Sequence, residues 1–183
     1  MKQKGVSHFS EQRIWVIGAS SGIGEACARM LIAAGAKVAL SSRRVERLNQ
    51  IAQTAAANQT LVMPLDVTKE EQLQQTYQTI LDAWSGIDLM LFVSGTYTPL
   101  RADNFDIHVA EQTIDANLLG PMRAVALVLP EMLKARSGHI AIVGSVAGYS
   151  GLPKALAYGP SKAAIINFCE NLYYDLLPSG ISV

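Results

Sequence analysis

Tyr158 and Lys162 are the residues whose types and spacing most directly suggest chemistry. They stand four positions apart in AYGPSKAA (157–164), and residues at i and i+4 lie on the same face of a helix. A lysine ammonium close to a phenol favours the phenolate form. The pair is therefore suited to exchanging protons with a substrate near neutral pH. The alternative is that a Tyr and a Lys at helical spacing are ordinary surface neighbours.

Ser145 is a further candidate because it ends an apolar segment, HIAIVGS (139–145), that is typical of a buried strand. In open α/β sheets, ligands bind at the carboxyl ends of the strands. The serine hydroxyl can there donate a hydrogen bond to a substrate oxygen as negative charge develops on it. The alternative role of a serine beside a glycine is to form a turn.

A glycine-rich segment, GASSGIG (18–24), follows the first apolar run of the chain. Its three glycines permit a tight turn, close approach of backbone N–H groups to a pyrophosphate, and close packing of a helix that begins near Ile23. A plain strand-to-helix connection is the alternative, but the position after the first strand favours dinucleotide binding. The predicted cofactor contacts of this loop are Gly18, Ser20, Ser21, Gly22, Ile23 and Gly24.

The second apolar run ends in SSRRVER (41–47), which lacks the acidic residue that commonly binds the adenosine ribose. Ser42 is small and uncharged in its place. Arg43 and Arg44 can form charge-assisted hydrogen bonds with a 2′-phosphate. The predicted cofactor is therefore NADP(H) rather than NAD(H), although two solvated arginines would explain the same letters.

Apolar runs rich in β-branched residues alternate with segments of helical period along the whole chain. Strands are expected at 13–18, 37–42, 60–66, 88–95 and 139–145, and helices at 25–35, 45–57 and 70–84. Such strands are buried on both faces. The pattern predicts a Rossmann-like α/β fold, a doubly wound parallel sheet in a single domain over 1–183 with a polar N-terminal tail at 1–12. Gly35 is expected just past the end of the first helix, and Thr68 is expected to cap the third.

Composition favours small-molecule chemistry. Of the 183 residues, 50% are hydrophobic and 16% charged, and 15 basic residues balance 15 acidic ones. No basic field is therefore expected to attract nucleic acid or an anionic membrane. The start of the chain is unlike a signal peptide, and no apolar run reaches the ~18 residues that a membrane span needs. A cytoplasmic protein without membrane or nucleic-acid partners is expected.

Other polar and titratable residues are interpreted as structural. Cys27 and Cys169 lie in apolar helical patterns and are expected in the core rather than in a disulfide. Asp88 and Asp115 are expected to be caps. The histidines, which are His8, His108 and His139, show no metal-ligand spacing, so no metal is predicted.

Taken together, the motifs resemble the short-chain dehydrogenase/reductase family. Gly18 to Gly24 matches its G-x-x-x-G-I-G, and Tyr158 to Lys162 matches its Y-x-x-x-K. The remaining matches are Asp66-Val67, an adenine-contacting pair after the third strand, Asn117 in DANLLGPM, and Ser145, thirteen positions before the tyrosine. They extend over nearly the whole chain.

The resemblance implies an NADP(H)-dependent oxidoreductase of carbonyls and secondary alcohols. NADPH would give a hydride to the carbonyl carbon and Tyr158 a proton to the oxygen, or the reverse. Lys162 would also bind the nicotinamide ribose, Ser145 would orient the substrate, and Asn117 would hold a water that links the lysine to solvent. The alternative is a non-catalytic nucleotide-binding or interaction module of the same fold.

Two positions depart from the family pattern. Ile17 stands where Thr is common, and FVSG (92–95) stands where N-N-A-G is common. Backbone contacts of Val93, Ser94 and Gly95 to the cofactor are expected to survive, but side-chain hydrogen bonds that brace the central strands are lost. Tyr97, just past this segment, is expected to border the nicotinamide pocket.

The length of the chain and its apolar helical segments lead to two further predictions. The chain stops at GISV, where family members begin a sixth strand, so the usual substrate-covering segment is expected to be absent. A fragment, a longer chain ordered only this far and a naturally short member all fit the sequence. Long apolar stretches around Asn117 and after Tyr158 predict a homodimer or homotetramer.

Overall fold

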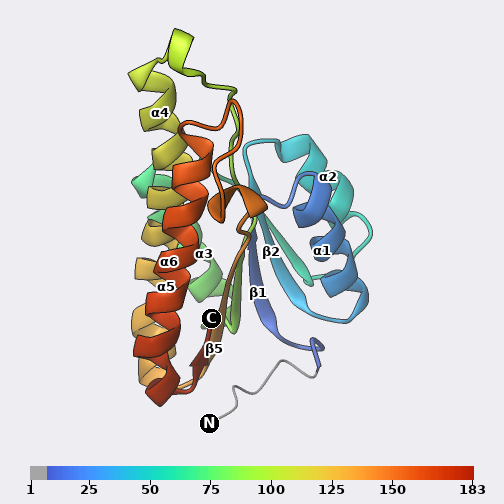
Figure 1. Cartoon of the computed structure of the whole chain (residues 1–183). Coiled ribbons are helices and arrows are strands. Elements are labelled where there is room, and N and C mark those ends of the chain that lie inside the picture. The colour runs from blue at the N-terminus through green and yellow to red at the C-terminus, as the bar shows by residue number, and fades with distance from the viewer. Residues whose placement is uncertain (1–7) are drawn as a thin grey trace.

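A parallel sheet flanked by helices forms the centre of the computed structural model, which describes residues 8–183 (Figure 1). The strands are β1 (Arg13–Ile17), β2 (Lys37–Ser42), β3 (Thr60–Pro64), β4 (Leu89–Phe92), β5 (Gly138–Ile142) and β6 (Ile181–Ser182). They pair in the order β3-β2-β1-β4-β5-β6, and every pairing is parallel. The expected Rossmann-like doubly wound fold is confirmed, and β6 is a short strand beside β5.

The helices cover both faces of this sheet (Figure 1). They are α1 (Gly22–Ala33), α2 (Val45–Ala52), α3 (Glu70–Trp84), α4 (Ile107–Ile114), α5 (Gly120–Ala135) and α6 (Tyr158–Leu176). Short helical turns lie at Ala102–Asn104, Asp115–Leu119, Val146–Gly148 and Leu177–Ser179. Helices α1 and α2 pack on one face, and α3, α5 and α6 pack on the other.

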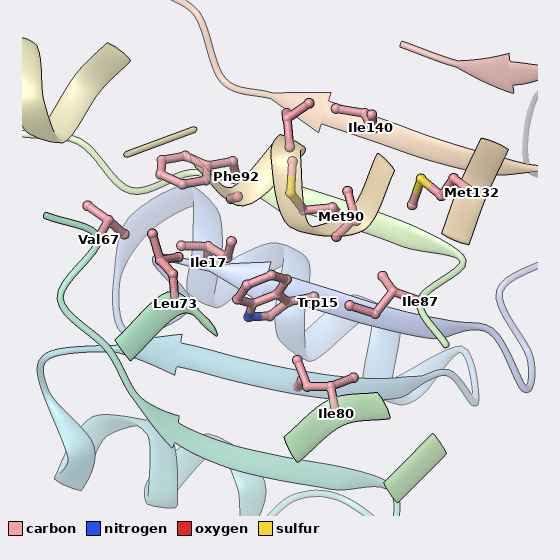
Figure 2. Packing of buried hydrophobic residues seen from close by; sticks show 14 of the residues in the cluster. Trp15, Ile17, Val67, Leu73, Ile80, Ile87, Met90, Phe92, Met132 and Ile140 are labelled. Carbon is pink, nitrogen blue, oxygen red and sulfur yellow. The ribbon is translucent and has the colours of Figure 1, made fainter. Parts of the chain in front are cut away.

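Two hydrophobic clusters follow from the alternation of side chains along each strand. Trp15 and Ile17 of β1 face α3 and α5, together with Met90 of β4 (Figure 2). Ile14 and Val16, the alternate residues of β1, face α1 and α2. Because β1 is buried on both faces, it lies at the middle of the molecule and fixes the position of the loop that follows it.

The ladder bonds of β3, β4 and β5 stop two to three residues before the expected strand ends. At the end of β4, the backbone N–H groups of Val93 and Ser94 both donate to the Ile17 carbonyl, at 2.8 and 2.9 Å. One carbonyl thus receives two donors, and the chain must leave the regular ladder. The residues after the strands are thereby freed to line a crevice at the carboxyl edge of the sheet.

Helix boundaries were predicted with mixed success. Gly35 follows α1 with φ 84° and donates its N–H to the Ile32 carbonyl at 3.0 Å, as expected of a glycine in that position. Thr68 does not cap α3: the cap residue is Lys69, and the Thr68 hydroxyl donates to Asp66 at 2.8 Å. Helix α2 ends at Ala52 rather than at residue 57, because the chain enters tight turns toward β3.

The interpretation of Asp88 as a cap is wrong, whereas Asp115 is the C-cap residue of α4. Asp88 forms an ion pair with Arg13 at 2.5 Å and also accepts the Arg13 backbone N–H, so it connects the starts of β1 and β4. Asp115 pairs with Arg123 at 2.6 Å. Asp88 therefore joins two strands, and Asp115 ends α4 while its carboxylate pairs with a residue of α5.

The expected core position of the cysteines holds only in part. Cys27 and Cys169 are both free thiols of intermediate exposure, and burial raises the pKa of Cys169. Within residues 8–183 no group of His, Cys, Asp and Glu has the arrangement of a metal site. In the same part of the chain, no helix combines the length and hydropathy that crossing a bilayer requires. Residues 1–7 of the expected tail lie outside the described residues.

Candidate active site

A crevice of about 1030 Å³ opens at the carboxyl edge of the sheet, where the strand order reverses between β1 and β4. Ligands of doubly wound sheets bind at such a reversal. Most of the predicted cofactor residues line it. They are Gly18, Ser20, Ser21, Ile23, Ser42, Arg43, Arg44, Asp66, Val67, Val93, Ser94, Gly95, Tyr158 and Lys162. Gly22 and Gly24 lie outside this lining.

The glycines of the first loop do different work. Gly18 has φ 98°, and a Cβ there would lie 2.5 Å from the Ser94 backbone nitrogen. A Cβ on Gly24 would collide with the Gly18 carbonyl, so this glycine lets α1 approach β1. Gly22 has φ 55° with open space around it, so only its backbone conformation favours glycine.

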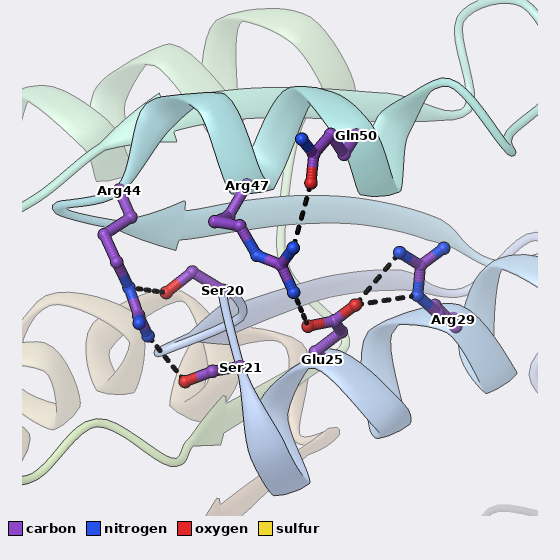
Figure 3. A network of polar contacts seen from close by, with 7 residues as sticks. All are labelled: Ser20, Ser21, Glu25, Arg29, Arg44, Arg47 and Gln50. Carbon is purple, nitrogen blue, oxygen red and sulfur yellow. Dashed lines mark hydrogen bonds and ion pairs between the residues drawn. The ribbon is translucent and has the colours of Figure 1, made fainter.

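Arg44 spans the gap between β2 and the glycine loop (Figure 3). Its Nε donates to the Ser20 hydroxyl at 3.1 Å, and its Nη2 donates to the Ser21 hydroxyl at 2.5 Å. Ser42 accepts the Arg44 backbone N–H at 3.1 Å. Arg44 is therefore held over the loop at the start of α1, where the helix N-terminus already favours an anion.

A second set of contacts, beside Arg44, joins α1 to α2 (Figure 3). Glu25 pairs with Arg29 at 3.0 Å and with Arg47 at 3.1 Å. The hydrogen bond from Arg29 holds the pKa of Glu25 below its usual value. Because Arg47 is directed to Glu25, it does not line the crevice, whereas Arg43 and Arg44 do.

Asp66 lies at the far end of the crevice, after β3. Burial raises the pKa of Asp66, but hydrogen bonds from Thr68 and the charges of Arg43 and Lys69 lower it by a larger amount. The resulting pKa of Asp66 is below its usual value. The carboxylate is therefore ionised at neutral pH. Its Oδ1 accepts both the Thr68 N–H and the Thr68 hydroxyl, at 3.0 and 2.8 Å, which leaves the acceptor capacity of Oδ2 for a ligand.

Tyr158 and Lys162 lie on the face of α6 that is directed to the crevice. Tyr158 is the first residue of α6, and Lys162 follows one turn later. The Lys162 ammonium is 5.8 Å from the centroid of the Tyr158 ring and donates to the Val143 carbonyl at 3.0 Å. Lys162 is only 6% exposed, and burial lowers its pKa. The ammonium thus lies one helical turn from Tyr158 and over its ring.

Asn117 is buried at 2% exposure in a π-helical turn, Asp115–Leu119, between α4 and α5. Its Oδ1 accepts the Thr96 N–H at 2.8 Å, and its Nδ2 donates to the Thr96 carbonyl at 2.9 Å and to the Ser161 hydroxyl at 3.1 Å. The Ser161 hydroxyl in turn donates to the Tyr158 carbonyl at 2.7 Å. Asn117 thus connects the loop after β4 to the first turn of α6.

Sequence reasoning missed Thr96 and Ser161 as partners of Asn117. The position of Ser161 directly before Lys162 was the only available signal, and a bond between residues 44 positions apart leaves no local pattern. The amide hydrogens of Asn117 are both taken by protein groups, so its side chain braces the site. A water at this residue would have to use other atoms.

Ser145 faces a second, smaller cavity of about 270 Å³. Its hydroxyl accepts the Ala147 N–H at 3.2 Å, as the first residue of a helical turn does. Tyr97 packs edge to face on Tyr158 with ring centroids 5.2 Å apart. Tyr97 and Tyr158 line both cavities, so they stand where the two spaces meet.

The departures at Ile17 and FVSG (92–95) are balanced by other bonds. The backbone of β1 holds the loop after β4 through the Ile17 carbonyl, and the Trp15 indole donates to the Ser41 hydroxyl at 2.9 Å. Asn117 adds the two bonds to Thr96. The central strands are therefore braced without the side chains that the sequence lacks.

The chain is similar to known proteins over most of its length. A family model described as short chain dehydrogenase matches residues 12–183. An uncharacterized oxidoreductase of Listeria innocua is 36% identical over 174 residues, which is 93% of this chain and 69% of that protein. Another from Staphylococcus aureus is 30% identical over 168 residues, which is 92% and 73% of the two chains.

The fold of the chain also matches that of a solved structure. The crystal structure of a short-chain dehydrogenase from Streptomyces avermitilis superposes with a TM-score of 0.91 at 27% identity. The match covers 95% of this chain and 64% of that one. The chain thus spans about two thirds of the length of the proteins that it matches.

Proposed function

The chain belongs to the short-chain dehydrogenase family, and on that premise we propose that it is an NADP(H)-dependent oxidoreductase that interconverts a carbonyl compound and a secondary alcohol. The observation that carries the proposal is the place of Tyr158. Its side chain lines both the crevice and the smaller cavity, with the Lys162 ammonium 5.8 Å from its ring. A hydroxyl there can give a proton to the oxygen of a substrate in the smaller cavity while a cofactor in the crevice would supply the hydride.

The residues of the chain have separate parts in the proposed reaction. When bound, NADPH supplies the hydride to the carbonyl carbon. Tyr158 gives its proton to the carbonyl oxygen, and the Lys162 ammonium stabilises the phenolate that remains. Ser145 donates a hydrogen bond to the same oxygen as it becomes negative. Asn117 holds the loop after β4 and the first turn of α6 in fixed positions relative to each other.

The crevice fits a phosphorylated dinucleotide by its chemistry. Backbone N–H groups at the start of α1 suit a pyrophosphate, and Asp66 suits the adenine end. Arg43 and Arg44 line the crevice where a ribose 2′-phosphate would lie next to β2. Two guanidinium groups without a neighbouring carboxylate from β2 favour NADP(H) over NAD(H).

Substitution of Tyr158 tests the proton transfer. Tyr158→Phe should lower kcat with NADPH and a panel of ketones by about 10²–10⁴-fold, followed as NADPH absorbance. Tyr173→Phe, on the same helix but away from both cavities, is the matched control and should keep the wild-type rate. Equal rates for Tyr158→Phe and wild type would remove the mechanism. Cofactor binding without turnover of any substrate would favour the non-catalytic alternative.

Cofactor choice is tested at the arginines. Replacing both Arg43 and Arg44 by Ala should weaken NADPH binding by at least about tenfold and leave NADH binding nearly unchanged, because only NADPH carries the 2′-phosphate. Arg47→Ala is the control, since Arg47 is directed to Glu25. Calorimetric titration with the two cofactors measures the difference. A wild-type preference for NADH would contradict the proposal.

We also propose that the protein self-associates and works in a reducing compartment such as the cytoplasm. Ala126, Pro130 and Leu133 form an exposed strip of small and apolar residues along α5. Such a face is suited to packing against its symmetry mate. The free thiols of Cys27 and Cys169 fit reducing surroundings.

A further inference from the structure

The smaller cavity beside the crevice has a lining that indicates a substrate class. It begins at Tyr158, because Tyr97 and Tyr158 border both spaces. Ser145, which lies three residues past the end of β5, is part of its lining. The other walls come from the segment between β5 and α6 and are Ala147, Leu152, Pro153 and Ala155.

The lining of the smaller cavity is uncharged and therefore disfavours charged substrates. Among the described residues that line the smaller cavity, none carries a formal charge. A carboxylate or ammonium group placed against this lining would lose part of its hydration and gain no counter-ion from the lining residues. A neutral carbonyl loses little, since the Ser145 hydroxyl accepts from Ala147 and keeps its own hydrogen to donate.

The size of the smaller cavity also favours a particular kind of substrate. A dry cavity of roughly 150 Å³ holds benzene, so about 270 Å³ has room for one ring with a short substituent. Tyr97 remains 51% exposed although it packs on Tyr158, so part of its ring is open to an aromatic neighbour.

The walls are also held in place before any ligand enters. The segment after β4 and the segment before α6 are joined by a backbone bridge between Leu100 and Ala155, both buried. The Leu100 N–H donates to the Lys154 carbonyl at 3.0 Å. Preformed walls make the selection depend on the lining rather than on loop closure.

We propose that the substrates are uncharged ketones with one aromatic ring beside the carbonyl, and the matching secondary alcohols. This inference rests on the proposed function. In the reduction, the hydride of NADPH forms the new C–H bond and the π bond of the carbonyl breaks. The oxygen takes the proton of the Tyr158 hydroxyl, so the ketone is reduced to the alcohol and NADPH is oxidised to NADP⁺. Solvent returns the proton to the phenolate.

Binding measured without turnover tests the substrate class. Acetophenone and 4-acetylbenzoate share the ring and the ketone and differ in one carboxylate. In NMR titrations with and without NADP⁺, acetophenone should bind at least about tenfold more tightly than 4-acetylbenzoate. Tyr97→Ala should lose most of this affinity, and Tyr149→Ala, exposed and outside the lining, should keep it. Equal affinities for the two ketones, or full acetophenone affinity in Tyr97→Ala, would overturn the inference.

Turnover of the same two ketones with NADPH separates this inference from the proposed function. Selective binding of acetophenone without hydride transfer to either ketone supports the substrate class and contradicts the oxidoreductase. Transfer to 4-acetylbenzoate as fast as to acetophenone supports the oxidoreductase and overturns the substrate class. Faster transfer to acetophenone supports both.

Discussion

Lys162 carries a stability cost at the place where its chemistry is needed. The residue is only 6% exposed, and its ammonium donates a hydrogen bond to the Val143 carbonyl. Burial lowers its pKa, which means that folding disfavours the charged form. A lysine chosen for stability alone would lie in solvent. The cost is understandable if the proposed role beside Tyr158 requires a cation there.

Replacing Lys162 by Met should therefore stabilise the fold while removing activity. The folded pKa of Lys162 lies below its unfolded value of 10.5, so the unfolded chain binds more protons and wild-type stability rises with pH up to about 10.5. At pH 7, Lys162→Met should raise Tm by about 2–4 °C. The gap between the two proteins should narrow as the pH approaches 10. Thermal unfolding followed by circular dichroism measures both, and a lower Tm for the variant at pH 7 would contradict the argument.

At the scale of elements, the glycine loop combines backbone conformation with close packing of β1, β4 and α1. Gly18 and Gly22 both have positive φ, but only Gly18 also has a backbone atom where its Cβ would lie. The two positions therefore separate conformational strain from collision. That separation is not visible in the sequence, where both are glycines of one motif.

Alanine substitutions should show the difference. Gly22→Ala should cost about 1–2 kcal/mol of unfolding free energy for the left-handed conformation alone. Gly18→Ala adds a collision 2.5 Å from the Ser94 nitrogen, and should cost about 3 kcal/mol or more and weaken cofactor binding. Urea denaturation of the purified variants compares the two costs. Equal costs would show that β4 can move away freely.

Elements with strong periodic patterns were predicted well, and those defined by distant partners were not. The alternation of apolar runs and amphipathic segments located β1, β2 and α3 almost to the residue. The ends of β4 and β5 were misplaced because a shared carbonyl at Ile17 and the contact of Val143 with Lys162 interrupt the ladder. Asp88 was misinterpreted because its partner, Arg13, is 75 positions away.

At the scale of the whole molecule, the exposed strip on α5 is the surface proposed for self-association. Ala126→Glu places a charge in that strip, and it should shift the protein from dimer or tetramer to monomer in sedimentation velocity. Met30→Glu, at an exposed apolar position of α1 on the other side of the sheet, is the control and should keep the assembly. A wild-type monomer, or an unchanged Ala126→Glu assembly, would contradict this proposal.

The π-helical turn at Asp115–Leu119 also bears on how the chain tolerates changes of length. A π turn holds one residue more than the regular winding on either side. Losing one residue from this turn would restore regular α-helical winding, so the side chains of the turn would leave the helix axis in different directions. Asn117 would then swing away from Thr96 and Ser161. The extra residue of the π turn therefore sets the direction of the Asn117 side chain. An in-frame deletion there should be as damaging as loss of the asparagine itself.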